Sequence, residues 1–264
     1  MAAEDPNGII VNTMKPLDFV AIGDITTDAF IRIKDATVTC DVNREHCTIC
    51  LRFGDKVPYE FVRVVRAVGN SSNASVAAAR LGLSSALITN MGDDQNGKEC
   101  LEVLRHEGVA TDWVKTHAGM ETNYHYILWY EEERTILIKH QEYPYQFPDI
   151  PAPKWFYLSS LAENSLPYHK QIETYLAQHP ETKVAFQPGT FQIKLGYEQL
   201  KGLYERSELF FCNKGEAQRI LGSSANDIKE LLKGIRDLGP NIAVITDGPK
   251  GAYTFDGSEM WHMP

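Results

Sequence analysis

The sequence has no long hydrophobic run and no excess of basic residues. No stretch approaches the ~20 apolar residues of a membrane-spanning helix. Residues 1–16 lack a basic segment followed by an apolar run, so we predict neither a membrane span nor a signal peptide. Lys and Arg number 26 against 35 Asp and Glu, a formal net charge of −9. A nucleic-acid-binding surface needs clustered basic residues, so this balance argues against that class, whereas a phosphate held by backbone amides stays possible.

Cysteine is also scarce, with five residues in the whole chain. An odd number predicts no disulfide framework and favours a reducing, cytoplasmic environment. Cys40, His46, Cys47 and Cys50 form a group that could bind Zn²⁺. The adjacent His46 and Cys47 reach one ion with difficulty, however, and the spacing matches no standard zinc finger. We therefore expect reduced cysteines in a β-rich segment, with zinc as the alternative.

The hydrophobic pattern predicts one α/β domain over residues 1–264, whose first 16 residues form a mobile leader. Short apolar runs alternate with segments of helical period, which predicts a mostly parallel sheet with helices on both faces. The expected strands are 17–23, 85–89, 154–158, 183–186, 209–212 and 242–246, and the expected helices are 71–81, 96–106, 167–178, 197–206, 214–221 and 227–238. Polar, β-branched segments within about 30–66 and 122–140 predict a small lid sheet, where His125 and His140 are expected to pack. No G-x-G-x-x-G follows the first strand, which argues against a dinucleotide-binding oxidoreductase.

Two loops carry candidate substrate contacts, because ligands of open α/β sheets bind at the carboxyl ends of the strands. In GDITTD, residues 23–28, Asp24 and Asp28 can accept hydrogen bonds from hydroxyl groups or cap a turn. In VGNSSN, residues 68–73, Gly69 lets the backbone approach a ligand. Asn73 offers a donor and an acceptor at a helix start. An ordinary capped helix is the alternative.

Two later loops carry candidate contacts for a metal ion and a nucleotide. Asn213 and Glu216 follow an apolar strand and lie either in a capping box or beside Mg²⁺, which prefers oxygen ligands. Thr246, Gly248 and Gly251 lie in TDGPKGAY, after another apolar strand. They line a nucleotide phosphate or ribose, or they form a tight hairpin turn.

The order and spacing of these segments resemble the ribokinase-like, or PfkB-type, carbohydrate kinase family over residues 17–263. MGDDQNG at 91–97 is similar to the family's G-x-D-x-x-G segment, and ITDGPKGAY is similar to its T-x-G-x-x-G nucleotide turn. The resemblance implies a three-layer α/β/α fold with a small β-sheet lid, ATP and Mg²⁺ as cofactors, and phosphate transfer to a hydroxyl of a sugar or nucleoside. It makes Asp28 the hydroxyl-binding carboxylate and places Glu216 near Mg²⁺ through water. It also implies a possible homodimer formed through the lid.

The sequence departs from the family pattern at two places. The paired glycines of the family's sugar loop are Val68 and Gly69 here, and Asn70, also a candidate substrate contact, stands where such sugar kinases often carry Lys. The specific substrate therefore stays open. The family's Gly-Ala-Gly-Asp motif, which supplies an anion hole and the catalytic base, occurs nowhere in the sequence and is expected beyond Pro264. We expect the 264 residues to have little or no kinase activity, with a non-catalytic sugar- or nucleoside-binding protein as the alternative.

Overall fold

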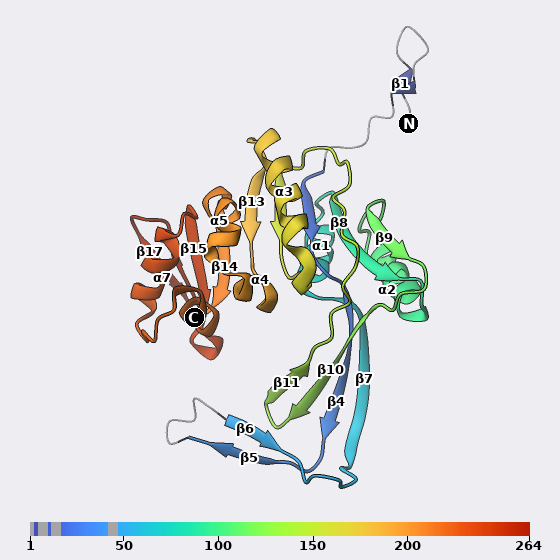
Figure 1. Ribbon diagram of the computed structural model, residues 1–264, viewed down its shortest axis with the longest axis vertical. Helices are drawn as coiled ribbons and strands as arrows, with labels where there is room; N and C mark the ends of the chain where they lie inside the picture. The colour runs from blue at the N-terminus through green and yellow to red at the C-terminus, as the bar shows by residue number, and fades with distance from the viewer. Residues whose placement is uncertain (1–2, 5–9, 12–16, 42–46) are drawn as a thin grey trace.

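A nine-stranded sheet forms the main body of the protein (Figure 1). The computed structural model describes residues 3–4, 10–11, 17–41 and 47–264. Seven strands of the sheet are parallel neighbours, in the spatial order β15 (Ile242–Thr246), β14 (Leu209–Asn213), β13 (Lys183–Phe186), β12 (Trp155–Leu158), β3 (Phe19–Ile22), β8 (Ser85–Gly92) and β9 (Val114–His117). Two antiparallel strands, β16 (Ala252–Phe255) and β17 (Met260–Met263), extend the edge beside β15.

Helices cover both faces of this sheet. Val20 and Ile22 of β3 belong to one hydrophobic core cluster, and Ala21 belongs to the other, as the alternation of side chains along a strand requires. The helices that complete the first cluster are α3 (Leu166–Gln178), α5 (Tyr197–Arg206), α6 (Lys214–Leu221) and α7 (Ile228–Asp237), and those beside the second are α1 (Asn70–Arg80) and α2 (Gln95–His106). The predicted three-layer α/β/α fold with a mostly parallel sheet is confirmed. Within the described ranges, no helix combines the length and apolarity needed to cross a bilayer.

Some short elements differ from the sequence-based expectation. β9, β16, β17 and the helix α4 (Thr190–Leu195) were not among the predicted elements, because four to six residues carry little periodicity. The strands β1 (Ala3–Glu4) and β2 (Ile10–Val11) pair with each other. Most of the predicted mobile leader lies outside the described residues.

A four-stranded lid sheet projects from the main body (Figure 1). Its strands, in spatial order, are β11 (Glu133–Leu137), β10 (Asn123–Tyr130), β4 (Thr26–Ile33) and β7 (Tyr59–Val68). β10 pairs with β4 in parallel, and the other two pairings are antiparallel. Because β4 begins at Thr26, Asp28 lies on a lid strand rather than in a loop.

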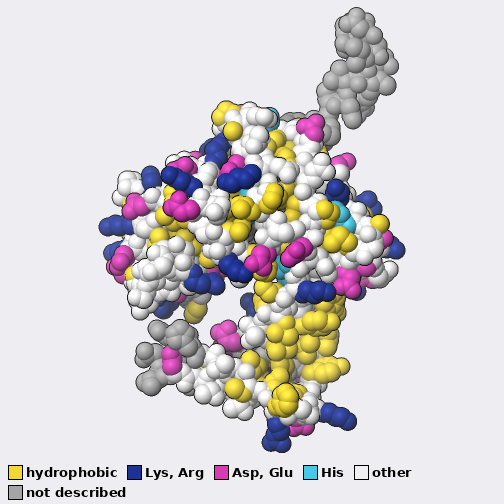
Figure 2. All heavy atoms as spheres, viewed as in Figure 1, with side chains coloured by type: hydrophobic (Ala, Val, Ile, Leu, Met, Phe, Trp, Pro, Cys, Tyr) yellow, Lys and Arg dark blue, Asp and Glu magenta, His cyan; other side chains and the backbone are white. Residues whose placement is uncertain are grey.

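The lid exposes an apolar surface to solvent. Figure 2 shows hydrophobic side chains gathered over the projecting part of the molecule. The alternating sequence VPYEFVRVV, residues 57–65, predicts a strand with one exposed face, but in β7 the consecutive residues from Tyr59 to Val64 are all exposed. This expectation is wrong because β7 is the edge strand of a sheet that extends away from the main body, so both faces of its outer half reach solvent.

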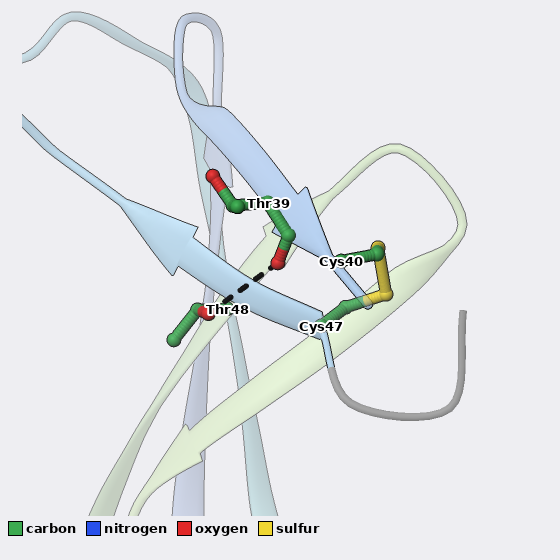
Figure 3. Close-up of a disulfide and its surroundings, with 4 residues drawn as sticks. All are labelled: Thr39, Cys40, Cys47 and Thr48. Carbon is green, nitrogen blue, oxygen red and sulfur yellow. Dashed lines mark hydrogen bonds between the residues drawn. A yellow bond between two sulfur atoms is a disulfide. The ribbon is translucent and has the colours of Figure 1, made fainter. Parts of the chain in front are cut away.

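A disulfide closes the hairpin of β5 (Thr37–Cys40) and β6 (Cys47–Cys50), which continues from the lid (Figure 3). Cys40 and Cys47 are register partners with Cα atoms 4.0 Å apart, so the expectation of reduced cysteines is wrong for this pair. Counting cysteines cannot reveal that strand pairing brings two of them together. Cys50 is free and exposed. His46 lies outside the described residues, and the part of the chain that is described contains no group of three metal-ligating side chains.

Candidate functional site

The first loop (residues 23–28) connects the main sheet to the lid. It starts directly after β3, where the Gly23 amide donates to the Ile88 carbonyl and the Asp24 amide donates to the Ser160 carbonyl. These bonds hold the loop between the middle of β8 and the carboxyl end of β12, at the edge where open α/β sheets bind ligands. Because β4 begins within this segment, at Thr26, Asp24 lies in the connection itself and Asp28 lies at the base of the lid strand.

Asp24 is the centre of a buried polar network. Its side chain is only 2% exposed, and its carboxylate accepts hydrogen bonds from Nδ1 of His140 at 3.0 Å and from the Tyr145 hydroxyl at 2.8 Å. The Tyr145 oxygen in turn accepts from the Ala162 amide at 3.1 Å. Burial, together with the nearby Asp24 charge, raises the pKa of Tyr145 far above its usual range, so its hydroxyl stays a donor. Asp24 therefore fastens the strap (residues 138–145), which follows β11, to the first loop.

Asp28 faces a histidine from the neighbouring lid strand. The parallel register of β4 and β10 pairs Asp28 with His125, and Nδ1 of the imidazole lies 3.4 Å from Oδ1 of the carboxylate. Two buried atoms of this pair, Asp28 Oδ1 and His125 Nε2, have no hydrogen-bond partner. The His125 ring also lies 5.3 Å from the ring of His140. The sequence patterns assigned both histidines to lid packing and missed their approach to the aspartates, because pairing between distant strands leaves no local signal.

Unpaired polar atoms concentrate around the first loop. Four of the seven buried side-chain atoms without a partner among the described residues belong to Asp28, His125, Ser71 and Ser159. The hydroxyl oxygens of Ser71 and Ser159 both crowd Gly23, because a Cβ placed there would lie 2.9 and 2.6 Å from them. Buried polar groups are normally paired within the protein, so a local group of exceptions indicates a place that water or a ligand satisfies.

The start of α1 packs against the same loop. Gly69 precedes the helix with a φ of +107°, and a Cβ at this position would lie 2.8 Å from the Asp24 carbonyl oxygen. Only glycine tolerates both this conformation and this approach. Asn70 and Asn73 lie in the first turns of α1 with exposed side chains. The structure thus brings Gly69 against Asp24 and leaves both asparagines at the solvent-facing side of the helix start.

The predicted metal and nucleotide residues meet further along the same sheet edge. Asn213 and Glu216 form a capping box at α6, with both reciprocal hydrogen bonds 2.8 Å long, so the structural alternative is confirmed. Asn213 is the register partner of Thr246 on β15. Gly248 and Gly251, with φ values of +52° and +87°, form the turn between the antiparallel β15 and β16, as the hairpin alternative predicts. A Cβ at Gly248 would meet no atom within 4 Å, so this turn leaves open space above it.

The G-x-D-x-x-G segment joins the body to the lid. Asp94 caps α2 by accepting from the Gly97 amide, and it also accepts from the amide and hydroxyl of Thr122, one residue before β10. Burial alone would raise the pKa of Asp94, but the hydrogen bonds from Thr122 and Gly97 outweigh it and lower the pKa overall. A Cβ at Gly92 would lie 2.1 Å from the Met120 carbonyl oxygen. This segment therefore positions the strand that carries His125.

Comparisons with known proteins agree with this architecture. A family model described as pfkB family carbohydrate kinase matches residues 36–264. A nucleoside kinase of Methanothermobacter thermautotrophicus is 22% identical over 190 residues, which are 71% of this chain and 60% of that protein. An ATP-dependent 6-phosphofructokinase of Thermoanaerobacterium thermosaccharolyticum is 21% identical over 268 residues, 96% of this chain and 76% of that protein.

The fold is shared with solved structures as well. A ribokinase of Arabidopsis thaliana, complexed with ribose and ATP, superimposes with a TM-score of 0.71 at 15% identity, covering 95% of this chain and 78% of that one. The chain spans 60% of the length of the nucleoside kinase, so it matches part of that relative. Because the family model covers most of the sequence, this chain belongs to the pfkB family of carbohydrate kinases.

Proposed function

We propose that this chain binds a sugar or nucleoside at the first loop and serves in the transfer of the γ-phosphoryl group of ATP to one of its hydroxyls. The observation that carries the proposal is the group of unpaired buried polar atoms on Asp28, His125, Ser71 and Ser159. Family membership supports the reaction class. The ribokinase of similar fold that binds ribose and ATP supports the two ligands.

Asp28 is the proposed direct contact for a substrate hydroxyl, because its Oδ1 atom is a buried acceptor without a partner. Gly69 admits the ligand close to the backbone, and Asn70 and Asn73 contact it from the first turns of α1. Asp24 was also a candidate contact, but it already accepts hydrogen bonds from His140 and Tyr145. We therefore assign Asp24 a positioning role, in which it holds the strap beside the substrate.

The nucleotide is proposed to lie over Thr246, Gly248 and Gly251, because the turn leaves open space at Gly248, whereas Gly251 packs against the Met263 carbonyl. Asn213 and Glu216 fit a magnesium ion held through water. The Asn213 amide donates to Oε2 of Glu216, so Oε1 lies outside the capping box and can accept a hydrogen bond from a water of the ion. Mg²⁺ usually keeps several waters and takes only one or two carboxylates together with phosphate oxygens. When bound, the ion neutralises charge on the phosphates. The chain's own residues position the two ligands on one edge of the sheet, which is the main requirement of phosphoryl transfer.

The 264 residues themselves are proposed to transfer phosphate poorly. The sequence contains no Gly-Ala-Gly-Asp segment, and none of the carboxylates described above has an evident role as the base. A general base contributes about 10²–10⁴-fold and an anion-hole donor about 10²–10³-fold to a rate. An ADP-release assay on this polypeptide, with the sugar or nucleoside that it binds, tests the point. Turnover well above the background without protein would refute it.

A binding protein without phosphotransfer is the second candidate function. It is favoured by the capping box, which already engages the polar groups of Asn213 and Glu216. A thermal-shift screen with sugars, nucleosides and ATP·Mg²⁺ separates the two proposals. Stabilisation by a sugar or nucleoside together with separate stabilisation by ATP·Mg²⁺ supports the kinase. Stabilisation by a sugar or nucleoside but not by ATP·Mg²⁺ supports the binding protein. If none of these ligands stabilises the protein, both proposed functions are contradicted.

A homodimer through the lid is also proposed. The exposed apolar side chains that would be covered by a second copy are Tyr59, Phe61, Val62, Val64, Tyr126, Ile136, Leu137 and Ile138. By strand register, Val62, Val64, Tyr126 and Leu137 lie on one face of this sheet, and an exposed apolar face of this kind is typical of an interaction site. Among the described residues, β7 and β11 are the edge strands of the lid sheet, and a second copy can cover such a sheet through a symmetric interface.

A further inference from the structure

We propose that His125 contacts the substrate through its Nε2 atom, and that Asp28 and His125 together bind two neighbouring hydroxyls. This inference rests on the proposed function, which places a sugar or nucleoside against the first loop. It adds a specificity-determining residue from the lid to a site whose other contacts come from the first loop and the start of α1.

The pair is built by strand register. β4 and β10 place Asp28 and His125 directly beside one another, and their side chains are only 21% and 11% exposed. Nδ1 of the imidazole faces the carboxylate at 3.4 Å, but Oδ1 of Asp28 still has no hydrogen-bond partner. A carboxylate on that side favours the tautomer with the proton on Nδ1, which makes Nε2 an acceptor. Nε2 is buried and has no partner either.

The His125 ring packs against the ring of His140, which belongs to the strap. The two rings lie 5.3 Å apart, and His140 is itself fixed by its bond to Asp24 and by an edge contact with Phe191 at 5.5 Å. A contact residue supported in this way is pre-organised for a ligand. The bond between the Tyr145 hydroxyl and Asp24 fixes the other end of the strap. The hydrogen bonds around Asp24 thus hold the strap that packs against the His125 ring, and His125 itself contacts the ligand.

The chemistry of the pair selects the ligand group. Asp28 Oδ1 and His125 Nε2 both accept hydrogen bonds, so the matching ligand offers two hydroxyl donors on neighbouring carbons. An anionic group would lie beside the carboxylates of Asp24 and Asp28, and like charges repel in a buried site. The pair therefore favours an uncharged polyol over a sugar acid or a sugar phosphate at this position.

Calorimetric titration of matched variants tests the proposal. The probe is the tightest binder among D-ribose, D-fructose and adenosine, together with its singly deoxygenated analogues. His125→Gln can present an amide where Nε2 lies, whereas His125→Asn reaches only the Nδ1 position. We expect His125→Leu and His125→Asn to weaken binding about tenfold, the effect of one lost hydrogen bond, and His125→Gln to stay within about threefold of the wild type. His106→Gln, at an exposed position of α2, is the control.

The deoxygenated analogues separate a contact from a purely structural role. Loss of the hydroxyl that meets His125 should weaken binding to the wild type about tenfold but to His125→Leu less than about threefold, because the partner is already gone. Equal losses for every analogue in both proteins, or equal behaviour of the Gln and Asn variants, would overturn the role of His125. In that case continued binding by the wild type would leave the proposed function intact. If none of the three probes binds the wild type, both proposals fail.

Discussion

Lowering the pH should destabilise the protein through His169, a fully buried histidine of α3. Its Nδ1 lies 2.7 Å from the Ser165 carbonyl oxygen, so it must donate. Its Nε2 lies 2.9 Å from the side-chain nitrogen of Gln192 and must accept. The same Gln192 side chain binds the Ser159 carbonyl and the Gly189 amide, next to the candidate site. A second ring proton would point at the Gln192 amide, so the network accommodates only the neutral histidine.

The magnitude follows from the pKa. Burial lowers the pKa of His169 from 6.5 to about 4. Between these values the unfolded chain binds the proton and the folded chain does not, so stability falls as the pH drops from 6.5 towards 4 and is fully present above 6.5. At about 1.4 kcal/mol for each tenfold change in proton affinity, the loss from this residue reaches about 3 kcal/mol.

Urea unfolding of the wild type and His169→Gln between pH 4.5 and 7.5 measures this effect. We expect the wild type to lose up to about 1.4 kcal/mol more stability per pH unit below pH 6.5 than the variant. His106→Gln, on the exposed surface of α2, should keep the slope of the wild type. NMR titration of the ring in the wild type gives a second measurement that does not depend on folding of the variant. A His169 midpoint near 6.5, or equal slopes for wild type and His169→Gln, would refute the reasoning.

Three further outcomes follow from other contacts. Asp24→Ala should lower the free energy of unfolding by about 3–5 kcal/mol, because it removes the buried carboxylate that accepts from the half-buried His140 and Tyr145. Exposed Asp55→Ala should change it by less than about 0.5 kcal/mol. A loss below about 1 kcal/mol for Asp24→Ala in urea would contradict the network. Val62→Glu should convert a lid dimer to monomers, as measured by light scattering, because it places a charge on the exposed apolar side of the lid. Lys56→Glu is the control and should leave the dimer intact. Dimers that survive Val62→Glu would exclude the lid as the interface. Reduction of the disulfide, whose cysteines are 7 residues apart, should destabilise the β5–β6 hairpin by about 2–2.5 kcal/mol. The melting temperature should not change, because among the described residues these two strands form a separate two-stranded sheet. Unchanged amide exchange in β5 and β6 would contradict this.

Local patterns in the sequence predicted most of the body. The apolar runs marked the strands because parallel strands are buried on both faces, and β8 is buried at every position. Asn213 and Glu216 marked the start of α6 because a capping box is a local signal. The candidate loops were also found from sequence, since they follow these strands directly.

Contacts between distant segments could not be predicted in the same way. The approach of His125 to Asp28 depends on the parallel register of two lid strands almost 100 positions apart in the chain. The bond between Asp24 and His140 depends on the path of the strap. The disulfide depends on which residues of a short hairpin lie opposite one another. In each case the residue types were visible, but the pairing is a property of the tertiary structure.

The most direct test of the account is calorimetric titration of Asp28→Asn with the sugar or nucleoside that binds the wild type. Asp28 Oδ1 is the buried acceptor without a partner. An amide keeps an acceptor oxygen but loses the negative charge that strengthens the hydrogen bond from a substrate hydroxyl, so Asp28→Asn should weaken binding about tenfold and change the free energy of unfolding by less than about 1 kcal/mol. Asp55→Asn, on the exposed lid, is the matched control. An affinity of Asp28→Asn within about twofold of the wild type would contradict a substrate site at the first loop.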